Sequence, residues 1–203
     1  MPPGQVVPLP TDFSDRGLTV EDAIERRRSV RDFPGPPITV LELSCLLHRA
    51  SGITEQTSGY RAAPSAGALY PLEPRVVANR VEGLPQGIYR YRPRDHSLET
   101  VREGDFSRQI SLAALGQDVV ARASVVLVLA AVFERSRSKY GERSYRYVLM
   151  ECGHVAQNVY LAATSMGLGA CAVGAFMDDE LNGLLGLDGV EEAALYLMCV
   201  GSP

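Results

Sequence analysis

A continuous apolar run between Ser124 and Phe133 constrains the fold of this chain more than any other feature. Its centre reads Val-Val-Leu-Val-Leu-Ala-Ala-Val, which has the length of a strand and contains no polar residue. A strand with one face in water alternates apolar and polar residues, whereas a strand covered on both faces does not. The run therefore predicts a central strand of a sheet that is covered on both sides.

The longest helical pattern follows this strand, over residues 142–166, and Gly167 ends it. Apolar and small residues occur nearly all round the predicted helix, so it has no broad polar face. We expect this helix to be buried, either in the middle of the protein or against a partner subunit.

Two more helices are predicted near the amino end. The first covers residues 18–28 with Thr19 as its N-cap, and the second begins at a capping box of Thr39 and Glu42 and ends at Gly52. Prolines between residues 32 and 37 predict a rigid turn that joins the two helices.

Short runs bounded by turn residues complete the pattern. The predicted strands are residues 75–79, 87–92, 97–101, 168–176 and 193–200, and the predicted short helices are residues 106–115 and 178–185. Residues 59–74 have the composition of a loop. Strands interleaved with helices indicate an α+β domain with a mixed sheet. We expect an extended segment over residues 1–17 and one domain over residues 18–203.

Composition excludes several classes of function. The 203 residues are 46% hydrophobic and 22% charged, as in a soluble globular protein. A net charge of −4 argues against a broad nucleic-acid-binding surface. No apolar run reaches the roughly 20 residues that cross a bilayer, and the first residues lack the pattern of a signal peptide. We therefore expect a cytoplasmic protein that binds neither nucleic acid nor membrane.

Cysteine and histidine spacing gives no sign of a metal site. Cys45, Cys152, Cys171 and Cys199 lie in apolar stretches and form no CxxC pair, so we expect buried, reduced thiols. The three histidines lack zinc-site spacing, and we expect no metal. No GxGxxG motif follows an early strand, which disfavours a Rossmann nucleotide site.

A cluster of basic residues near the amino end indicates an anion site. Arg27, Arg28, Ser29 and Arg31 lie close together in the sequence. If the first helix persisted to Ser29, residues three and four apart would share a side, and at least two guanidinium groups would converge. Arginine forks and a hydroxyl group together suit a phosphate. The alternative is a solvated basic helix end.

Two segments rich in small residues, 61–71 and 167–176, would let the backbone approach a flat ligand. Each has a simpler interpretation. The first is also typical of a surface loop, and the second of a tightly packed strand.

Lys139 and Tyr140 fall between the apolar strand and the long helix, where loops at strand ends commonly present reactive groups. Lysine accepts a proton only if burial or neighbouring positive charge lowers its pKa, and tyrosine can orient a substrate or donate a proton. The alternatives are a solvated pair or an ion-paired interface.

Six motifs occur in a fixed order along the chain. They are Arg-Arg-Ser-Val-Arg at 27–31, Pro-Ser-Ala-Gly-Ala-Leu-Tyr-Pro at 64–71, Gly-Ile-Tyr-Arg-Tyr at 87–91, Lys-Tyr-Gly-Glu-Arg-Ser-Tyr-Arg-Tyr at 139–147, Glu-Cys-Gly-His-Val-Ala-Gln-Asn at 151–158 and Gly-Leu-Gly-Ala at 167–170. Over about residues 18–203 the chain resembles the flavin-dependent nitroreductase superfamily, and within it the SagB-type dehydrogenase branch, which includes azoline oxidases of thiazole- and oxazole-modified peptide pathways.

The resemblance implies a nitroreductase-like α+β fold, with a mixed, mainly antiparallel sheet flanked by helices and a long buried central helix at a homodimer interface. It also implies one FMN per subunit at that interface, with both chains contributing to each site. The residues matching the phosphate grip are Arg27, Arg28, Ser29 and Arg31.

The resemblance assigns three further sets of residues. The loop that approaches the flavin, from the partner subunit, matches Pro64, Ser65, Ala66 and Gly67. The backbone along the isoalloxazine ring matches Val173, Gly174 and Ala175. The pair implicated in proton removal by azoline oxidases matches Lys139 and Tyr140.

The expected function is that of an FMN-dependent oxidoreductase that transfers a hydride between a small organic or azoline-type substrate and flavin N5. The expected partners are a second copy of the chain and a small-molecule or modified-peptide substrate. Two alternatives stay open at this point: an NAD(P)H-dependent nitro or quinone reductase, and a non-catalytic flavin-binding protein within a peptide-modifying complex.

Overall fold

The computed structural model describes residues 3–13 and 17–203. Seven strands form its main sheet, and their bounds are β1 (Val6–Pro8), β5 (Leu72–Ala78), β7 (Gly87–Arg92), β8 (Ser97–Glu103), β9 (Val125–Val132), β10 (Gly169–Val173) and β11 (Glu192–Gly201). The strands are ordered β1-β8-β7-β5-β9-β11-β10, and every neighbouring pair is antiparallel. In the part of the chain that the structure describes, the only parallel strand pair joins the two-residue strands β2 (Ile38–Thr39) and β6 (Val81–Glu82). The predicted α+β class with a mainly antiparallel sheet is confirmed.

Strand β9 is the central strand that its apolar run predicts. It pairs with β5 on one side and with β11 on the other. Leu127 and Leu129 point into one hydrophobic core, whereas Val126 and Val128 point into a second core on the opposite face. Because successive side chains alternate across a strand, a wholly apolar strand fills both cores.

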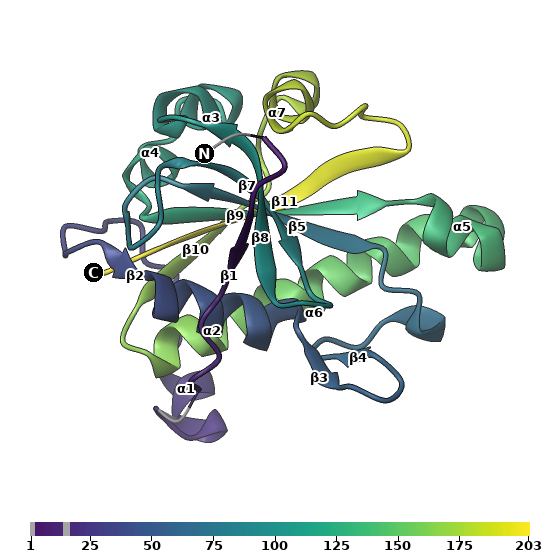
Figure 1. Ribbon diagram of the computed structural model, residues 1–203, viewed down its shortest axis with the longest axis horizontal. Helices are drawn as coiled ribbons and strands as arrows, with labels where there is room; N and C mark the ends of the chain where they lie inside the picture. Colours follow the sequence, from purple (N-terminus) through teal and green to yellow (C-terminus); the bar gives the residue numbers. More distant parts are fainter. Residues whose placement is uncertain (1–2, 14–16) are drawn as a thin grey trace.

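Helices cover both faces of the sheet (Figure 1). On one face lie α2 (Val40–Ser51) and α6 (Ser144–Ser165), with α1 (Val20–Arg26) packed outside α6. On the other face lie α3 (Ser107–Ala113), α4 (Asp118–Arg122) and α7 (Asp178–Leu185). The predicted strands and short helices listed by residue range above agree with the structure to within three residues at each end.

Helix α2 begins and ends where its sequence predicts. Thr39 Oγ1 accepts a hydrogen bond from the Glu42 N–H at 3.2 Å, and the Glu42 carboxylate accepts one from the Thr39 N–H at 2.6 Å. Gly52 is the C-cap. The capping box is therefore confirmed in both directions.

Helix α1 is shorter than predicted. Thr19 is its N-cap, but the helix ends at Arg26, and Arg27 takes φ −50° and ψ 124°. Residues 27–31, here called the arginine segment, run along β10 instead. Ser29 forms a parallel bridge with Ala170, and the Val30 N–H donates to the Ala170 carbonyl at 2.9 Å. The predicted helix end at Arg28 is two residues too late, and the condition of a helical path to Ser29 is not met, because this pairing draws the chain out of the helix.

The region around Lys139 is also more ordered than predicted. A short helix, α5 (Glu134–Tyr140), carries Lys139 and Tyr140, which the sequence placed in a loop. Gly141, at φ 56°, ends α5, and a 3-10 turn over Gly141–Arg143 leads into α6. The long helix, predicted to start at residue 142, starts two residues later at Ser144, because Gly141 with its positive φ and the 3-10 turn precede it.

Residues 59–74, predicted as a loop, contain regular elements. Strand β4 (Tyr60–Arg61) pairs with β3 (Ile53–Glu55), a 3-10 turn covers Ala66–Ala68, and β5 begins at Leu72. Strand β4 is paired with the neighbouring strand β3, whereas Leu72 pairs with Ala131 of β9, and composition reveals neither pairing.

Helix α6 is buried by its own chain on one side only. Val148, Val155 and Val159 are buried, whereas Leu149 and Met150 are exposed. The near absence of a polar face therefore does not reflect burial within one subunit. Across residues 3–13 and 17–203, no helix is both long and apolar enough to cross a bilayer, and all four cysteines are buried.

Gly169 allows the arginine segment to lie against β10, and its replacement tests that contact. An added Cβ would lie 2.8 Å from Val30 Cγ1 and 3.2 Å from Phe33 Cε1. We expect Gly169→Ala to lower the free energy of unfolding by about 1–3 kcal/mol in urea denaturation, because the segment must move. Gly174→Ala is the matched control, since its nearest neighbour is a Tyr196 ring atom at 3.6 Å. Two variants as stable as the wild type would contradict the close packing.

Candidate functional site

The arginine segment presents alternate residues to two sides because it is extended. On one side, the Arg27 guanidinium carbon lies 5.0 Å from the centre of the Tyr160 ring, and Ser29 Oγ lies 3.0 Å from Tyr160 Oη. Arg31 follows Ser29 by two residues and so shares this side. Arg28 lies on the other side, where it lines a cavity of about 520 Å³ together with Val30.

The structure thus brings together a different set from the one that helical spacing predicts. Arg27, Ser29 and Arg31 share a side, whereas Arg28 Nη1 donates to the carbonyl oxygens of Glu25 at 2.9 Å and Arg27 at 2.8 Å. The charge of Arg31 acts on Cys171 of β10. The site therefore has two guanidinium groups and a hydroxyl group on the Tyr160 side of the arginine segment. The Arg28 guanidinium group lies on the opposite side.

Tyr160 of α6 holds this arrangement in place, and sequence reasoning missed it. Its hydroxyl group contacts Ser29 and accepts a hydrogen bond from the Ala172 N–H at 2.8 Å. One side chain therefore joins α6, β10 and the arginine segment. A tyrosine within an apolar helix gives no local signal of this role.

The cations of the arginine segment have room for an anion. Among the described residues, no carboxylate lies within ion-pair distance of Arg27, Arg28 or Arg31. Arg28, Ser29 and Arg31 are exposed, and Arg27 is half-buried. Unpaired guanidinium groups beside a hydroxyl form a donor set that suits a phosphate.

The end of β10 lies next to this donor set and has an open backbone. Val173 is buried, whereas Gly174 and Ala175 are exposed. The Ala175 carbonyl accepts a hydrogen bond from Gln117 Nε2 at 2.9 Å. Because a Cβ at Gly174 would make only ordinary contacts, the fold itself does not require glycine there. A flat ligand lying on this backbone would require it.

A second group of predicted residues meets at α5. The Pro64–Gly67 loop turns at Gly67, where φ is 64°. A Cβ added at Gly67 would lie 2.6 Å from Tyr140 Oη and 2.9 Å from Lys139 Nζ. The loop and the Lys139–Tyr140 pair are therefore in contact within one chain, and Gly67 makes the approach possible.

Lys139 differs from all other basic side chains of the arginine and lysine type in this sequence. It is the only lysine in a chain with 20 lysine and arginine residues together. Arginine stays protonated in proteins, whereas lysine can lose its proton when it is desolvated. A chain that uses arginine at every other basic position thus has its one titratable side-chain amine beside the Pro64–Gly67 loop.

Glu151 of α6 lies beneath this loop and is a second residue that sequence reasoning missed. It is buried, its carboxyl group hydrogen-bonds the Ser65 side chain, and it faces Arg61. Burial raises the pKa of Glu151 to about 7, against the opposing effects of Ser65 and Arg61. The carboxyl group therefore ties the loop to α6 and changes charge near neutral pH. Its sequence signal is an acidic residue amid the small and apolar residues of this helix.

The two groups of residues lie far apart in one chain. Tyr140 packs edge-on against Tyr147, with ring centres 5.0 Å apart, at the start of α6, whereas the arginine segment meets Tyr160 near its end. These tyrosines are 13 positions apart, which corresponds to roughly 20 Å of helix. Figure 1 shows α5 at one end of α6 and α1 near the other. A single chain does not bring all the predicted site residues together.

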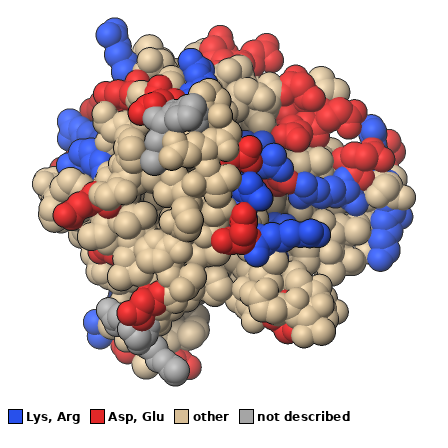
Figure 2. Space-filling model, in the orientation of Figure 1, with Lys and Arg blue, Asp and Glu red and all other residues tan. Residues whose placement is uncertain are grey.

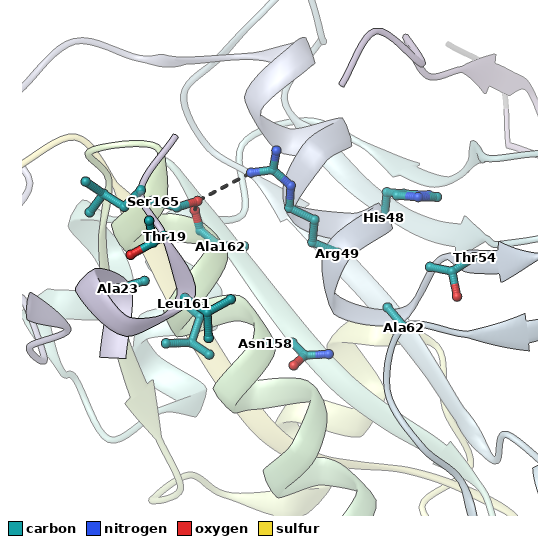
Figure 3. A pocket seen from close by; sticks show the side chains of 12 residues that line it. Thr19, Ala23, His48, Arg49, Thr54, Ala62, Asn158, Leu161, Ala162 and Ser165 are labelled. Carbon is teal, nitrogen blue, oxygen red and sulfur yellow. Dashed lines mark hydrogen bonds between the residues drawn. The ribbon is translucent and has the colours of Figure 1, made fainter. Parts of the chain in front are cut away.

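A cavity of about 600 Å³ contains none of the predicted site residues. Figure 3 shows it between α1, α2 and α6, with Asn158 and Leu161 of α6 among the side chains that line it. Arg49 Nη1 donates to Ser165 Oγ at 3.4 Å across one end. Within the described ranges, histidine, cysteine and acidic side chains form no cluster that would hold a metal.

The raised pKa of Glu151 gives a pH-dependent stability. The unfolded chain releases this proton near pH 4.3 and the folded chain only near pH 7, so folded protein binds more protons in between and loses stability as the pH rises through that window. Glu151→Gln should remove this loss, gaining up to about 3 kcal/mol relative to the wild type between about pH 5 and pH 8 in urea denaturation. Exposed Glu82→Gln is the control. Parallel pH profiles for Glu151→Gln and the wild type would contradict the assignment.

Comparison with known proteins gives the family. The nitroreductase family model matches residues 24–202. A protein of Methanocaldococcus jannaschii that is named as a nitroreductase, MJ1384, is 46% identical over 184 residues, which is 91% of each chain. A structure described as a nitroreductase from Ralstonia eutropha has a TM-score of 0.84 at 28% identity, covering 98% of this chain and 92% of that chain.

A peptide-processing protein is also similar. The microcin B17-processing protein McbC of Escherichia coli is 29% identical over 169 residues, which is 81% of this chain but only 62% of McbC. The structure of the Escherichia coli microcin synthetase McbBCD complex with truncated pro-MccB17 bound contains a chain with a TM-score of 0.77 at 27% identity, covering 97% of this chain and 77% of that chain. Members of the matched family are generally flavin oxidoreductases. The chain described here belongs to the nitroreductase family.

Proposed function

We propose that the protein is an FMN-dependent oxidoreductase whose active site is completed by a second copy of the chain. The observation that carries this proposal is the placement of two groups of site residues at opposite ends of α6. One group has unpaired cations and an open backbone, and the other has the single lysine and a small-residue loop. The first group has no lysine, and the second has neither the arginine segment nor the open backbone at the end of β10.

The residues at the end of β10 fit FMN. Arg27, Ser29 and Arg31 would hold its phosphate group through charge-assisted hydrogen bonds, and Arg28 would add charge from behind the segment. The backbone of Val173–Ala175 would lie along the isoalloxazine ring. The open position at Gly174 supports this assignment, because a side chain there would meet the ring rather than the rest of the protein.

A symmetric dimer would join the two groups. A two-fold axis across α6 would set the start of this helix in one chain beside the end of the helix in the other. The exposed face of α6, with Leu149 and Met150, offers apolar surface for that contact. The Pro64–Gly67 loop and Lys139 of one subunit would then face the cofactor site of the partner subunit.

FMN, when bound, would supply the redox chemistry, a hydride transfer between a substrate carbon and flavin N5. The chain itself would position the substrate and move a proton. Lys139 would remove the carbon-bound proton, and Tyr140 would orient the substrate or assist the transfer. Lys139 is exposed in the single chain, so the second subunit would have to cover it and exclude water from it. The similarity to McbC supports an azoline-type or other small organic substrate.

A second candidate function is an NAD(P)H-dependent nitro or quinone reductase. The similarity to MJ1384 over 91% of both chains favours it. The two functions use the same cofactor site in opposite directions. Rapid anaerobic bleaching of the flavin by NADPH or NADH would favour the reductase, and bleaching by an azoline-bearing substrate the dehydrogenase.

Removal of Arg27 tests the phosphate site. Loss of a charge-assisted hydrogen bond to a phosphate should weaken FMN binding by about tenfold or more, measured by quenching of flavin fluorescence. Arg26→Ala is the matched control, because Arg26 pairs with Asp22 at 3.3 Å on the surface of α1. Equal FMN affinities in Arg27→Ala, Arg26→Ala and the wild type would overturn the assignment.

Removal of Lys139 tests the proton acceptor. Lys139→Ala should keep its fold and its FMN but reduce azoline-dependent flavin bleaching by about 100-fold or more. An amine-selective acylating reagent should have the same effect on the wild type, since Lys139 carries the only side-chain amine. Ser138→Ala, an exposed neighbour, should retain the wild-type rate. Full turnover in Lys139→Ala would show that another group takes the proton.

A further inference from the structure

A cavity of about 570 Å³ lies next to the Pro64–Gly67 loop, and Ala68, Leu69 and Tyr70 are part of its lining. Its charged lining consists of Arg61, Arg90, Arg92, Arg94, Arg135 and Glu73. We call it the basic cavity. Figure 2 shows basic side chains, with fewer acidic ones among them, gathered right of centre on one face of a protein whose net charge is −4. Most of these arginines lie outside the six sequence motifs.

Nearby carboxylates do not balance this charge. Glu73 is shared by Arg75 at 3.5 Å, Arg90 at 2.8 Å and Arg135. Although burial acts to raise it, the hydrogen bond and charge of Arg135, with the other two cations, lower the pKa of Glu73, so this group is ionised. At the rim, Arg92 pairs with Asp95 at 3.0 Å. Positive charge remains in excess.

Two arginines of the lining are available to a ligand. Among the described residues, neither Arg61 nor Arg94 has a carboxylate within ion-pair distance. Arg61 is held in place, because its Nη1 donates to the Leu72 carbonyl at 3.2 Å and its guanidinium carbon lies 4.9 Å from the centre of the Tyr70 ring. Its remaining N–H groups are free to meet an anion in a fixed geometry.

The electrostatics favour an anion at this position. Burial, and then the charge of Arg135, lower the pKa of Arg61, while Glu151 and Glu73 act in the opposite direction. Arginine remains protonated despite such a shift, so a partly desolvated cation lies beside another cation. A bound anion would relieve that repulsion and take up the spare donors.

The basic cavity is connected to the proposed active site. Arg135 donates from Nη1 to the Tyr70 carbonyl at 3.1 Å, and it also bonds the Glu73 carboxylate. Arg135 lies on α5 one turn before Lys139, and Tyr70 lies three residues after Gly67. Part of the cavity lining is therefore built from α5, which carries Lys139, and from the residues that follow the Pro64–Gly67 loop.

We infer that the basic cavity binds an anionic group of the substrate, a phosphate or a carboxylate, while the reactive carbon lies near Lys139. The placement of the reactive carbon near Lys139 rests on the proposed function. The cavity has a volume within the range of ordinary small-molecule sites and would select substrates that carry an oxyanion.

Calorimetric titration of the FMN-loaded protein with pyrophosphate, and separately with citrate, tests the inference. We expect at least one probe to bind, and the tighter one indicates whether the natural group is a phosphate or a carboxylate. Arg61→Gln should weaken binding about tenfold. Because Arg61 also holds Leu72, that variant can lose its fold, so exposed Arg94→Ala provides a second test with an expected weakening of about threefold.

Arg108→Ala is the control, since it removes the same charge from an exposed position on α3 outside the cavity. Equal weakening by Arg94→Ala and Arg108→Ala, or binding of neither probe, would overturn the inference. Release of flavin in step with probe binding would also overturn it, because the probe would then occupy the phosphate grip. Probe binding that depends on Arg94 in a protein that takes up no FMN would instead overturn the proposed function and leave the anion site standing.

Discussion

The pairing of the arginine segment with β10 is the interaction on which the site depends. The Ser29–Ala170 bridge and the hydrogen bond from the Val30 N–H to the Ala170 carbonyl turn a helix end into an extended segment. Successive side chains of an extended segment point to opposite sides. Arg27 and Ser29 therefore contact Tyr160, whereas Arg28 points away from it. A donor set that suits an anion arises next to the open backbone of β10 because of this alternation.

Helix α6 determines how the rest of the site must be built. It contacts the arginine segment through Tyr160 and the Pro64–Gly67 loop through Glu151, and these residues lie two and a half turns apart. Under the proposed function, this separation would prevent one subunit from completing the site. The same helix exposes Leu149 and Met150, so the element that separates the two groups also provides the surface on which a second subunit would reunite them. The basic cavity extends this arrangement beyond Lys139 through Arg135.

Much of the fold follows from local sequence patterns. The apolar run of β9 needs only strand alternation to predict burial on both faces, and the Thr39–Glu42 capping box needs only a helix start. The structure departs from these predictions at α1 and at the segment that carries Lys139. Helix α1 stops early because of β10, which lies more than a hundred residues away in sequence, and Lys139 lies on a short separate helix, α5, which Gly141 ends with a positive φ. Tyr160, Glu151 and the basic cavity escaped sequence reasoning because their partners come from distant segments.

The central claim is that one chain cannot hold the cofactor in a complete site. Sedimentation velocity of the FMN-loaded protein, followed at the flavin absorption band over a dilution series, tests it most directly. The account predicts that flavin sediments with a species of twice the 22.0 kDa chain mass and is released as that species dissociates, because ligand binding and assembly are linked. Flavin that stays bound with undiminished affinity to a single chain, or a stable dimer that takes up none, would contradict it.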